Sequence, residues 1–459
     1  MRWLADLAYL LVGLTYLPVA LYHALIVGKN RRGWGERFGR VPASDPNQPR
    51  IWIHAVSLGE VNATPRLVSD LRERLPGTDV VFSTTTDTGY ARAVQLYGAD
   101  RVFRFPLDFS PVVARVLRRV KPSMIVLVEL EVWYNLVRLA TRRGTPVAVV
   151  NGRLTARSAR RLERTGRFAR SMFGDLAWVG AQDEAIAERF RDLGVPPDRV
   201  EVTSSLKWDS AAVTDHVEGD QALAHALGIT PSRPLWVCGS TGPGEEEMIL
   251  DAYRALLNAG LQATSVEPNP NGELGACTRA SLAIVPRKPE RFDEVAGLIA
   301  AAGFTCTRRS QHADTMPAPQ PDGLTVILGD TMGELRKFYA LASVVFVGRS
   351  LVPLGGSDPM EVAALGRPIV VGPHMENFEL AVRALRQADA IRIVEGPKAL
   401  PAVVRELLGN RALAEGLGSR ARQVVRQNQG ATGRTVARLV QLLERTRVAG
   451  VDRRGFAVR

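Results

Sequence analysis

Short apolar segments alternate with longer amphipathic segments along most of this chain, and no other feature constrains its fold as strongly. The apolar segments are rich in Val, Ile and Leu, which is typical of strands that are buried on both faces of a sheet. The segments between them have apolar residues at helical spacing. Such regular alternation predicts parallel sheets covered by helices on both faces, the doubly wound α/β class.

The alternation runs through the chain twice, with a lapse near residues 207–219. The strands expected in the first run are Ile51–Val56, Val80–Ser83, Val102–Phe105, Met124–Val128, Val147–Val150 and Ala177–Val179. Those expected in the second run are Leu235–Cys238, Leu282–Val285, Thr325–Leu328, Val344–Val347 and Ile369–Val371. We therefore expect two Rossmann-like domains, at residues 33–208 and 209–428, followed by a C-terminal helix and tail at 429–459. Ligands of such domains bind at the carboxyl ends of the strands, here in a central cleft.

The first 32 residues differ from the rest. Leu7–Val27 is a stretch of 21 residues without a formal charge, just long enough to cross the hydrocarbon core of a bilayer. Lys29, Arg31 and Arg32 follow it, and this charge order predicts that the bulk of the protein lies on the cytoplasmic side. We expect residues 1–32 to form a membrane anchor with a basic flank. Whether it spans the bilayer or lies in the interface stays open, because Pro18 interrupts it.

Composition narrows the partners only in part. The chain has 59 Lys and Arg residues against 47 Asp and Glu residues, a net charge of +12, and nearly all the cations are arginine. This excess suits nucleic acid, anionic lipid or a phosphorylated ligand without choosing among them. Cys238, Cys277 and Cys306 are scattered, and the histidines form no cluster. We expect neither a disulfide framework nor a metal site.

Two glycine-rich turns of the second run are candidate phosphate sites. Gly239–Gly244 follows an expected strand and precedes a helix with an acidic first turn. Backbone N–H groups at such a turn can bind phosphate, and a tight structural turn explains the pattern equally well. Gly355–Glu361 also follows a strand, and Glu361 could bind the diol of a ribose or simply be favoured by the helix dipole. Neither turn is a dinucleotide fingerprint or a P-loop.

Three charged residues of the first run are candidates for chemistry. Glu60 follows the first expected strand, on an expected loop before a helix that begins at Pro65 with Thr64 as its cap. There it could act as a general base. Glu129 closes a strongly apolar strand, and Lys207 stands at the junction of the two runs. For these two residues, a structural salt bridge is an equally good interpretation.

Read together, these segments resemble the 3-deoxy-D-manno-octulosonic acid (Kdo) transferases of lipopolysaccharide assembly. The matching segments are Arg32–Gly39, His54–Glu60, Thr84–Gly89, Glu129–Trp133, Asn151–Ser158, Ser205–Asp209, Val285–Phe292, Gly329–Leu335, Gly355–Glu361 and Gly372–Phe378. Each segment is a weak signal, but they occur in the family's order over nearly the whole chain after the anchor.

The resemblance implies a GT-B glycosyltransferase that transfers Kdo from CMP-Kdo to the lipid A precursor (lipid IVA). The transfer would invert the anomeric centre and use neither a metal nor another cofactor. The chain has no Asp-x-Asp sequence, which transferases that hold a diphosphate through a divalent ion commonly contain. The implied location is the cytoplasmic face of the cell inner membrane, and no nucleic-acid partner is expected.

The resemblance also implies roles for single residues. Glu60 matches the base that deprotonates the acceptor hydroxyl, and Glu129 and Lys207 match positions that stabilise the transition state. The residues that match CMP-binding positions are Pro286, Arg287, Met332, Gly333, Glu334, Asp358, Pro359, Met360 and Glu361.

The chain departs from the family pattern at a few of its positions. The family usually has Gly-Gly-His-Asn-Pro where this chain has Ser357 and Asp358 after its two glycines, so a carboxylate replaces a neutral amide beside the expected CMP. Ser204 and Arg349 stand where glycine is usual. Two alternatives therefore stay open: a GT-B transferase that uses another nucleotide sugar, and a non-catalytic membrane-bound relative that binds a nucleotide or a lipid.

Overall fold

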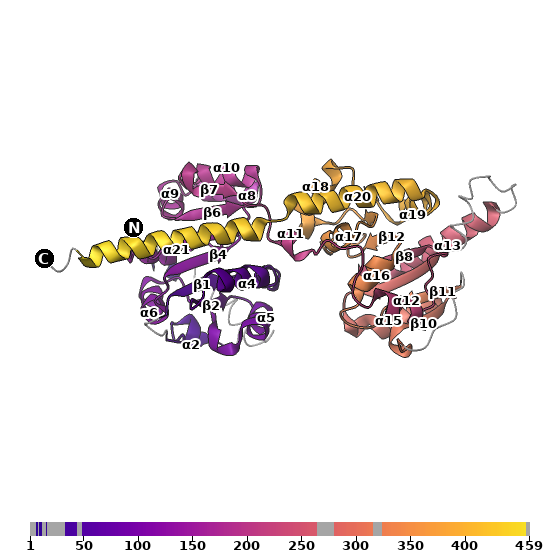
Figure 1. The fold of residues 1–459 in the computed structure, drawn as a ribbon, viewed down its shortest axis with the longest axis horizontal. Helices are drawn as coiled ribbons and strands as arrows, with labels where there is room; N and C mark the ends of the chain where they lie inside the picture. Colours follow the sequence, from indigo (N-terminus) through magenta and orange to yellow (C-terminus); the bar gives the residue numbers. More distant parts are fainter. Residues whose placement is uncertain are drawn as a thin grey trace. The chain divides into compact units, whose positions relative to one another are not determined.

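The computed structural model describes residues 33–43, 48–263, 280–314 and 324–455, together with Asp6, Leu7, Tyr9–Leu11 and Thr15. The chain forms two compact units, which are residues 1–210 with 428–459, and residues 211–427 (Figure 1). Each unit contains one seven-stranded sheet. All pairings between its neighbouring strands are parallel. The expected pair of parallel-sheet α/β domains is confirmed.

The first unit has the strand order β3-β2-β1-β4-β5-β6-β7. Its strands are β1 (Arg50–His54), β2 (Asp79–Thr84), β3 (Val102–Arg104), β4 (Met124–Val128), β5 (Val147–Gly152), β6 (Trp178–Ala181) and β7 (Val200–Val202). Its helices are α2 (Trp34–Arg37), α3 (Leu58–Asn62), α4 (Pro65–Arg74), α5 (Asp87–Tyr97), α6 (Ser110–Val120), α7 (Tyr134–Arg142), α8 (Ala156–Glu163), α9 (Arg167–Phe173), α10 (Glu184–Asp192), α11 (Lys207–Ser210) and α21 (Ala431–Gly455). The chain changes direction across the sheet between β1 and β4, and ligands of doubly wound sheets bind at such a switch point.

The second unit has the strand order β10-β11-β9-β8-β12-β13-β14, with its switch point between β8 and β12. Its strands are β8 (Leu235–Thr241), β9 (Ser281–Pro286), β10 (Thr305–Arg308), β11 (Thr325–Leu328), β12 (Val344–Val347), β13 (Ile369–Val371) and β14 (Arg392–Ile393). Its helices are α12 (Asp220–Ala226), α13 (Glu245–Ala263), α15 (Phe292–Ala301), α16 (Leu335–Leu341), α17 (Met360–Ala364), α18 (Glu379–Gln387), α19 (Leu400–Gly409) and α20 (Arg411–Asn428), the last of which ends at the boundary between the units.

Both faces of each sheet are buried. On β1, Ile51 and Ile53 point into a cluster that includes residues of α4, α5 and α21, while Trp52 points to the opposite face, where its ring lies near Phe103. None of the three β1 side chains is exposed to solvent. This double burial explains why the central strands have continuous apolar sequences.

Three strands were not predicted from the sequence, namely β7, β10 and β14, and all three lie at an edge of their sheet. In β10 and β14 no residue is fully buried, and in β7 only Val200 is. Because an edge strand is covered on fewer sides, it needs no continuous apolar run. The periodicity that reveals the central strands is therefore absent from these three.

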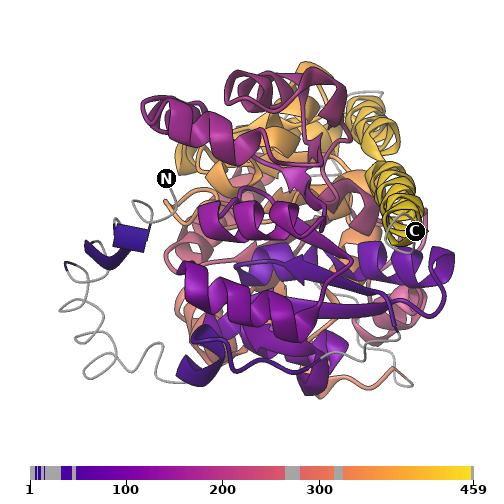
Figure 2. The same ribbon diagram turned by 90° about the vertical axis from the view of Figure 1, so that its left-hand side faces the viewer.

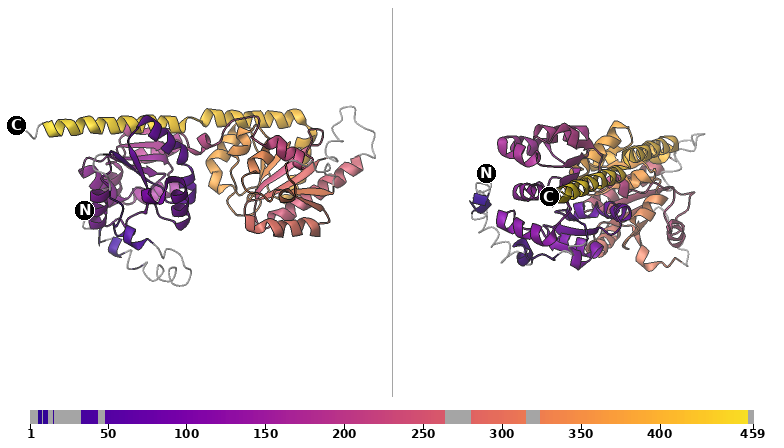
Figure 3. Two further views of the ribbon diagram at one scale, coloured as in Figure 1. Left: turned by 60° about the horizontal axis from the view of Figure 1, so that its bottom comes forward. Right: turned by 60° about the vertical axis from the view of Figure 1, so that its left-hand side comes forward.

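The C-terminal helix α21 packs against α4 of the first unit. Figure 3 shows it as a long helix along this unit, and Figure 2 views it nearly along its axis. The carboxylate of Asp209 holds its first turn, because it accepts hydrogen bonds from the backbone N–H groups of Gly430 (2.6 Å) and Thr432. Asp209 is itself only 8% exposed. This contact attaches the start of α21 to the first unit.

Among the described residues, no helix is long and apolar enough to cross a membrane. Most of the expected anchor at residues 1–32 lies outside the described residues.

Replacing Asp209 with alanine removes the acceptor for two backbone N–H groups at the start of α21. We expect a loss of about 2–3 kcal/mol of stability, since these are charge-assisted capping bonds. Hydrogen exchange along α21 and thermal unfolding of the full chain measure the effect. The exposed Asp198 supplies the matched control, Asp198→Ala. Equal exchange rates in both variants would show that Asp209 does not hold the helix.

Candidate functional site

The carboxyl ends of β1 and β4 bring Glu60 and Glu129 to the switch point of the first sheet. The two strands are neighbours in parallel register, so the residues that follow them share one edge of the sheet. The predicted loop position of Glu60 was wrong, because Glu60 lies in the short helix α3, which Ser57 caps. The next helix, α4, begins at Pro65, as predicted.

Glu60 is held from two sides. Its Oε2 accepts a hydrogen bond from the backbone N–H of Val56 at 2.8 Å, and its Oε1 accepts one from the Ser57 hydroxyl at 2.8 Å. Its side chain is largely buried, with 9% of the residue exposed. Burial raises the pKa of Glu60, the hydrogen bonds from Val56 and Ser57 oppose this, and the Glu129 carboxylate raises it further. The result is an oriented carboxylate with a strengthened affinity for a proton.

Glu129 directly follows β4 in a left-handed backbone conformation, with φ of +61°. Its N–H still donates to the carbonyl of Val150 in β5 (3.0 Å), so the hydrogen-bond ladder extends one residue past β4. Left-handed backbone is uncommon for residues other than glycine. Residues in such strained conformations cluster at active sites and ligand-binding sites.

Glu131 joins this group and was not selected from the sequence. Its Oε2 accepts a hydrogen bond from the Trp133 indole N–H at 3.1 Å and lies 4.0 Å from Nε2 of the buried His54. Burial, and next the charge of Glu60, raise the pKa of Glu131 to about 7. Burial lowers the pKa of His54 to about 3, so this ring is neutral at pH 7. The sequence did contain a signal for this residue, because Glu131 is a second glutamate only two residues after Glu129.

Lys207 begins α11, and the turn before it is fixed to the end of β5. The side-chain Oδ1 of Asn151 accepts hydrogen bonds from the backbone N–H of Leu206 and the hydroxyl of Ser205, both at 3.2 Å. The structure therefore places Lys207 at the same edge of the sheet as Glu129, since β5 is the neighbour of β4.

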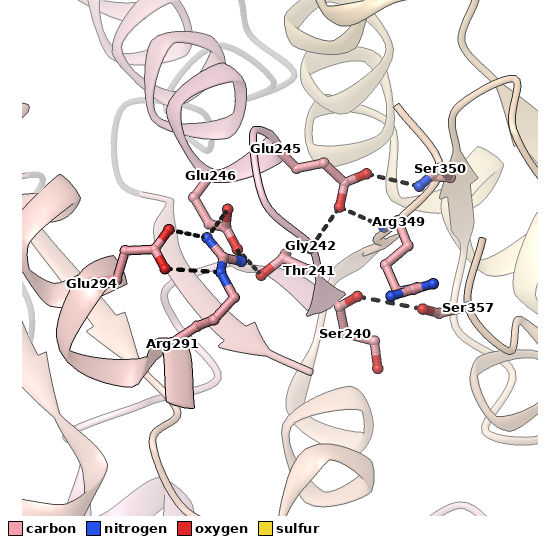
Figure 4. Close-up of polar contacts among 10 residues, drawn as sticks. All are labelled: Ser240, Thr241, Gly242, Glu245, Glu246, Arg291, Glu294, Arg349, Ser350 and Ser357. Carbon is pink, nitrogen blue, oxygen red and sulfur yellow. Dashed lines mark hydrogen bonds and ion pairs between the residues drawn. The ribbon is translucent and has the colours of Figure 1, made fainter. Parts of the chain in front are cut away.

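In the second unit, the glycine-rich turn Gly239–Gly244 already has an anion beside it. The buried carboxylate of Glu245 accepts hydrogen bonds from the backbone N–H groups of Gly242, Arg349 and Ser350 (Figure 4). It accepts a fourth from the N–H of Leu351 at 2.9 Å. These groups belong to the turns after β8 and β12, so the hydrogen bonds of Glu245 link the two turns across the switch point of this sheet. The structure thus favours the structural interpretation of this turn.

Glu246 has an equally structural role. Its carboxylate forms a bidentate ion pair with Arg291, at 2.6 and 3.1 Å, and accepts the Thr241 hydroxyl at 2.8 Å (Figure 4). Arg291 also pairs with Glu294 of α15 at 2.7 Å. This network joins the starts of α13 and α15 behind the carboxyl ends of β8 and β9.

Several of the predicted CMP-binding residues meet at this edge. Pro286 ends β9, and Arg287 follows it with Nη1 3.5 Å from the hydroxyl of Ser357. Burial lowers the pKa of Arg287, the positive charge of Arg349 lowers it further, and Asp358 opposes the shift. The guanidinium groups of Arg287 and Arg349 and the carboxylate of Asp358 are therefore close enough to interact.

The turn around Pro359 leads into α17. Oδ1 of Asp358 accepts a hydrogen bond from the N–H of Met360, the first residue of α17, at 2.8 Å. Burial raises the pKa of Glu361, against the opposing charge of Arg336. Burial and then the charges of Glu361 and Asp358 raise the pKa of Tyr339, so both carboxylates lie near its phenol.

Met332, Gly333 and Glu334 follow β11, which lies beyond β9 in the sheet. Met332 is 70% exposed. Burial opposes ionisation of Glu334, but hydrogen bonds from Arg309 (2.9 Å), Thr331 and Lys337 outweigh it and lower the pKa. The structure thus ties Glu334 to Arg309 and Lys337 rather than to Arg287. Within the described residues, no group of three or more His, Cys, Asp or Glu side chains is arranged to hold a metal ion.

Comparison with known proteins identifies the family to which this chain belongs. Residues 32–210 match the sequence profile described as 3-deoxy-D-manno-octulosonic-acid transferase (kdotransferase). The chain is 34% identical over 419 residues to the 3-deoxy-D-manno-octulosonic acid transferase of Haemophilus influenzae, covering 90% of this chain and 92% of the relative. The chain belongs to the Kdo transferase family. The Bordetella pertussis protein of the same name is 35% identical over 409 residues, which is 87% of this chain and 89% of the relative.

Membership of the Kdo transferase family makes the chain a glycosyltransferase, as the ordered motifs predicted. A solved structure of MurG from Acinetobacter baumannii has the same fold, with a TM-score of 0.51 over 86% of this chain and 99% of that chain. It is 15% identical, so the likeness concerns the two parallel-sheet domains of GT-B glycosyltransferases alone.

Two departures from the Kdo transferase pattern have a structural explanation. Ser204 and Arg349, which stand where glycine is usual, have φ of +69° and +62°. Glycine adopts this conformation without steric cost, whereas other residues lose about 1–2 kcal/mol. Here, side-chain contacts compensate in part: the Ser204 hydroxyl bonds Asn428 at 3.3 Å, and the Arg349 guanidinium donates to the carbonyl of Leu354 at 2.8 Å.

Glu131 gives a pH-dependent prediction. Its pKa of about 7 in the folded protein exceeds the ordinary 4.5, so the folded state binds the proton more tightly and stability falls as pH rises between these values. Glu131→Gln keeps an acceptor for Trp133 and removes the titration. We expect the melting temperature of the variant to exceed that of the wild type by about 2–5 °C at pH 8 and to match it near pH 4.5. The exposed Glu163 supplies the control, Glu163→Gln; an equal shift at both pH values would contradict the assignment.

Proposed function

We propose that this chain transfers Kdo from CMP-Kdo to the lipid A precursor lipid IVA, at the cytoplasmic face of the inner membrane. Membership of the Kdo transferase family supports the donor and the acceptor. The observation that carries the mechanism is Glu60, a buried carboxylate at a switch point whose two oxygens are oriented by Val56 and Ser57. A general base needs this combination of fixed geometry and raised pKa.

In the proposed step, the oxygen of the acceptor hydroxyl attacks the anomeric carbon of Kdo. The new glycosidic bond forms as the bond from that carbon to the phosphate oxygen of CMP breaks, and CMP leaves with the electron pair. The hydroxyl proton passes to Glu60. A single displacement inverts the anomeric centre and needs no covalent nucleophile. Glu129 and Lys207, at the same edge of the sheet, are assigned to stabilise the transition state.

The donor site that we propose lies in the second unit. It consists of Pro286, Arg287, Met332, Gly333, Glu334, Asp358, Pro359, Met360 and Glu361. Arg287 supplies positive charge for the phosphate of the leaving CMP. A phosphomonoester leaving group can be stabilised in this way by fixed side chains, and the proposal assigns no role to a metal or another cofactor.

The membrane location rests on the sequence of residues 1–32 and on the chemistry of a lipid acceptor. Asp6 shows where this segment meets the folded protein. Its Oδ1 accepts hydrogen bonds from the backbone N–H of Ser110 and the side-chain amide of Asn135, both at 2.9 Å. An apolar stretch that continues from this point would keep the first unit close to a lipid surface.

Glu60→Gln tests the base. We expect the transfer rate to fall by about a hundred- to ten-thousand-fold, because the amide cannot take up the proton. The wild-type rate should fall on the acid side at a pH above 4.5, since the pKa of Glu60 is raised and the protonated carboxyl cannot act as a base. The assay supplies CMP-Kdo and a tetra-acylated lipid A precursor and counts added Kdo units by mass spectrometry.

Glu163→Gln is the matched control, and CMP binding by Glu60→Gln should stay at the wild-type level because the proposed CMP residues lie in the other unit. Full activity of Glu60→Gln would exclude Glu60 as the base. No product from a folded wild type would favour the two alternatives, another nucleotide sugar or a non-catalytic relative.

Asp358 bears on the alternative that the chain uses another nucleotide sugar, because the carboxylate of Asp358 would repel the phosphate of a bound CMP. Asp358→Asn keeps an oxygen for the N–H of Met360, so this hydrogen bond at the start of α17 survives. If CMP binds beside it, removing the charge should tighten CMP binding by about tenfold, measured by calorimetry at low salt. Unchanged affinity would place the nucleotide away from Asp358. Binding of UDP but not CMP by either protein would indicate a different donor.

A further inference from the structure

Five arginines gather on the first unit, away from the residues of this unit that are proposed for catalysis. They are Arg40, Arg115, Arg118, Arg119 and Arg143. With Gly39, the first four line an open pocket of about 550 Å³. Burial and then the charge of Arg118 lower the pKa of Arg143, which places its guanidinium within electrostatic reach of the pocket.

The pocket lies toward the edge of the sheet opposite to Glu60. Helix α6 runs from the carboxyl end of β3 to the start of β4, as a crossover between parallel strands must. Arg118 and Arg119 are in its last turn. Glu60, in contrast, follows the carboxyl end of β1. The pocket is therefore not part of the candidate catalytic edge.

Contacts with the backbone hold two of these arginine side chains, Arg115 and Arg119. Nη1 of Arg115 donates to the carbonyl of Phe38 at 3.2 Å, and Nε of Arg119 donates to the carbonyl of Val41 at 2.7 Å. Gly39 has φ of +88°, and a Cβ there would lie 3.1 Å from Cδ of Arg115. Glycine thus allows Arg115 to lie across the backbone. The side chains are partly ordered before any ligand binds, which reduces the entropic cost of binding.

Among the described residues, the pocket has no counterpart of the ion pairs that compensate arginine charge elsewhere in this unit. Arg50 and Arg104, for example, pair with Asp79 and Asp87 at 2.6 and 2.5 Å. Within the described part of the chain, none of the four lining arginines forms an ion pair with a carboxylate. Like charges held together in this way repel one another, and an anion in the pocket would remove that cost.

We propose that this arginine pocket binds a phosphate group. Guanidinium groups match the geometry of phosphate oxygens and remain charged at every physiological pH. The phosphate could belong to a phospholipid headgroup or to a free phosphorylated compound. The neighbouring side chains favour the headgroup: Trp34 and Phe38 are 44% and 49% exposed, with ring centroids 6.0 Å apart. Exposed aromatic rings beside cations are typical of surfaces that meet a bilayer interface. This site does not depend on the proposed transfer reaction.

The test uses the full chain in micelles of a neutral detergent, so that the N-terminal segment is in the same environment throughout. Calorimetry measures binding of inorganic phosphate in one arm. In the other arm, micelles containing phosphatidylglycerol are compared with micelles containing phosphatidylcholine at the same mole fraction. The test variant is Arg115→Gln with Arg118→Gln. The control, Arg72→Gln with Arg74→Gln, removes the same charge from exposed positions of α4.

For the headgroup, we expect the test variant to bind phosphatidylglycerol about 30-fold more weakly than the control variant does. If free phosphate is the ligand, inorganic phosphate binds the wild type saturably and the test variant loses that binding, while the two lipids behave alike. The melting temperature of the test variant should equal or exceed that of the wild type, because repulsion is relieved. Identical binding by the test and control variants in both arms would overturn the proposal.

Discussion

A parallel strand that is buried on both faces has little room for charged side chains along its centre, and this constraint governs both units. The centre of β1 (residues 51–53) and all of β4 are apolar and completely buried, and the carboxylates Glu60, Glu129 and Glu131 follow within a few residues of the strand ends. In the second unit, β8 and β12 are followed by the turns that surround Glu245. The candidate chemistry is therefore confined to the carboxyl edges, as the topology of doubly wound sheets requires.

The buried carboxylates at these two edges differ in how far their charge is compensated. Glu245 accepts four backbone N–H groups, and Glu246 has a bidentate arginine partner. These two hold turns together. Glu60 accepts only one backbone N–H and one hydroxyl, and Glu131 accepts one indole N–H. Burial raises the pKa of Glu60, Glu131 and Glu245 alike, so the shift does not separate a base from a structural carboxylate. The difference lies in the oxygens: each oxygen of Glu245 accepts two N–H groups, whereas each oxygen of Glu60 accepts one donor and keeps a lone pair for a proton.

The sequence was sufficient for the architecture because the central strands are apolar throughout, and insufficient for edge strands such as β14, which are half-exposed. At the site, Glu60 could be recognised because a short turn separates it from a buried strand. The role of Glu245 could not be recognised, since its partners Ser350 and Leu351 lie more than 100 residues further along the chain. The signal for Glu131 was present, but its significance depends on contact with His54 and Trp133, which periodicity does not reveal.

Backbone strain marks the same edges independently. Within the part of the chain that the structure describes, seven non-glycine residues have positive φ. Five of them follow a strand or lie at its carboxyl end: Glu129, Asn151, Ser204, Ser240 and Arg349. The other two, Lys121 and Asp389, follow helices, where left-handed residues are ordinary terminators. Each strained residue lowers stability by about 1–2 kcal/mol. A fold that holds five of them at its two carboxyl edges keeps these turns in shapes that relaxed backbone would not adopt. Hydrogen bonds hold the turns that carry Glu129 and Lys207, and the turn at Arg349 beside Arg287, in these conformations in spite of the strain.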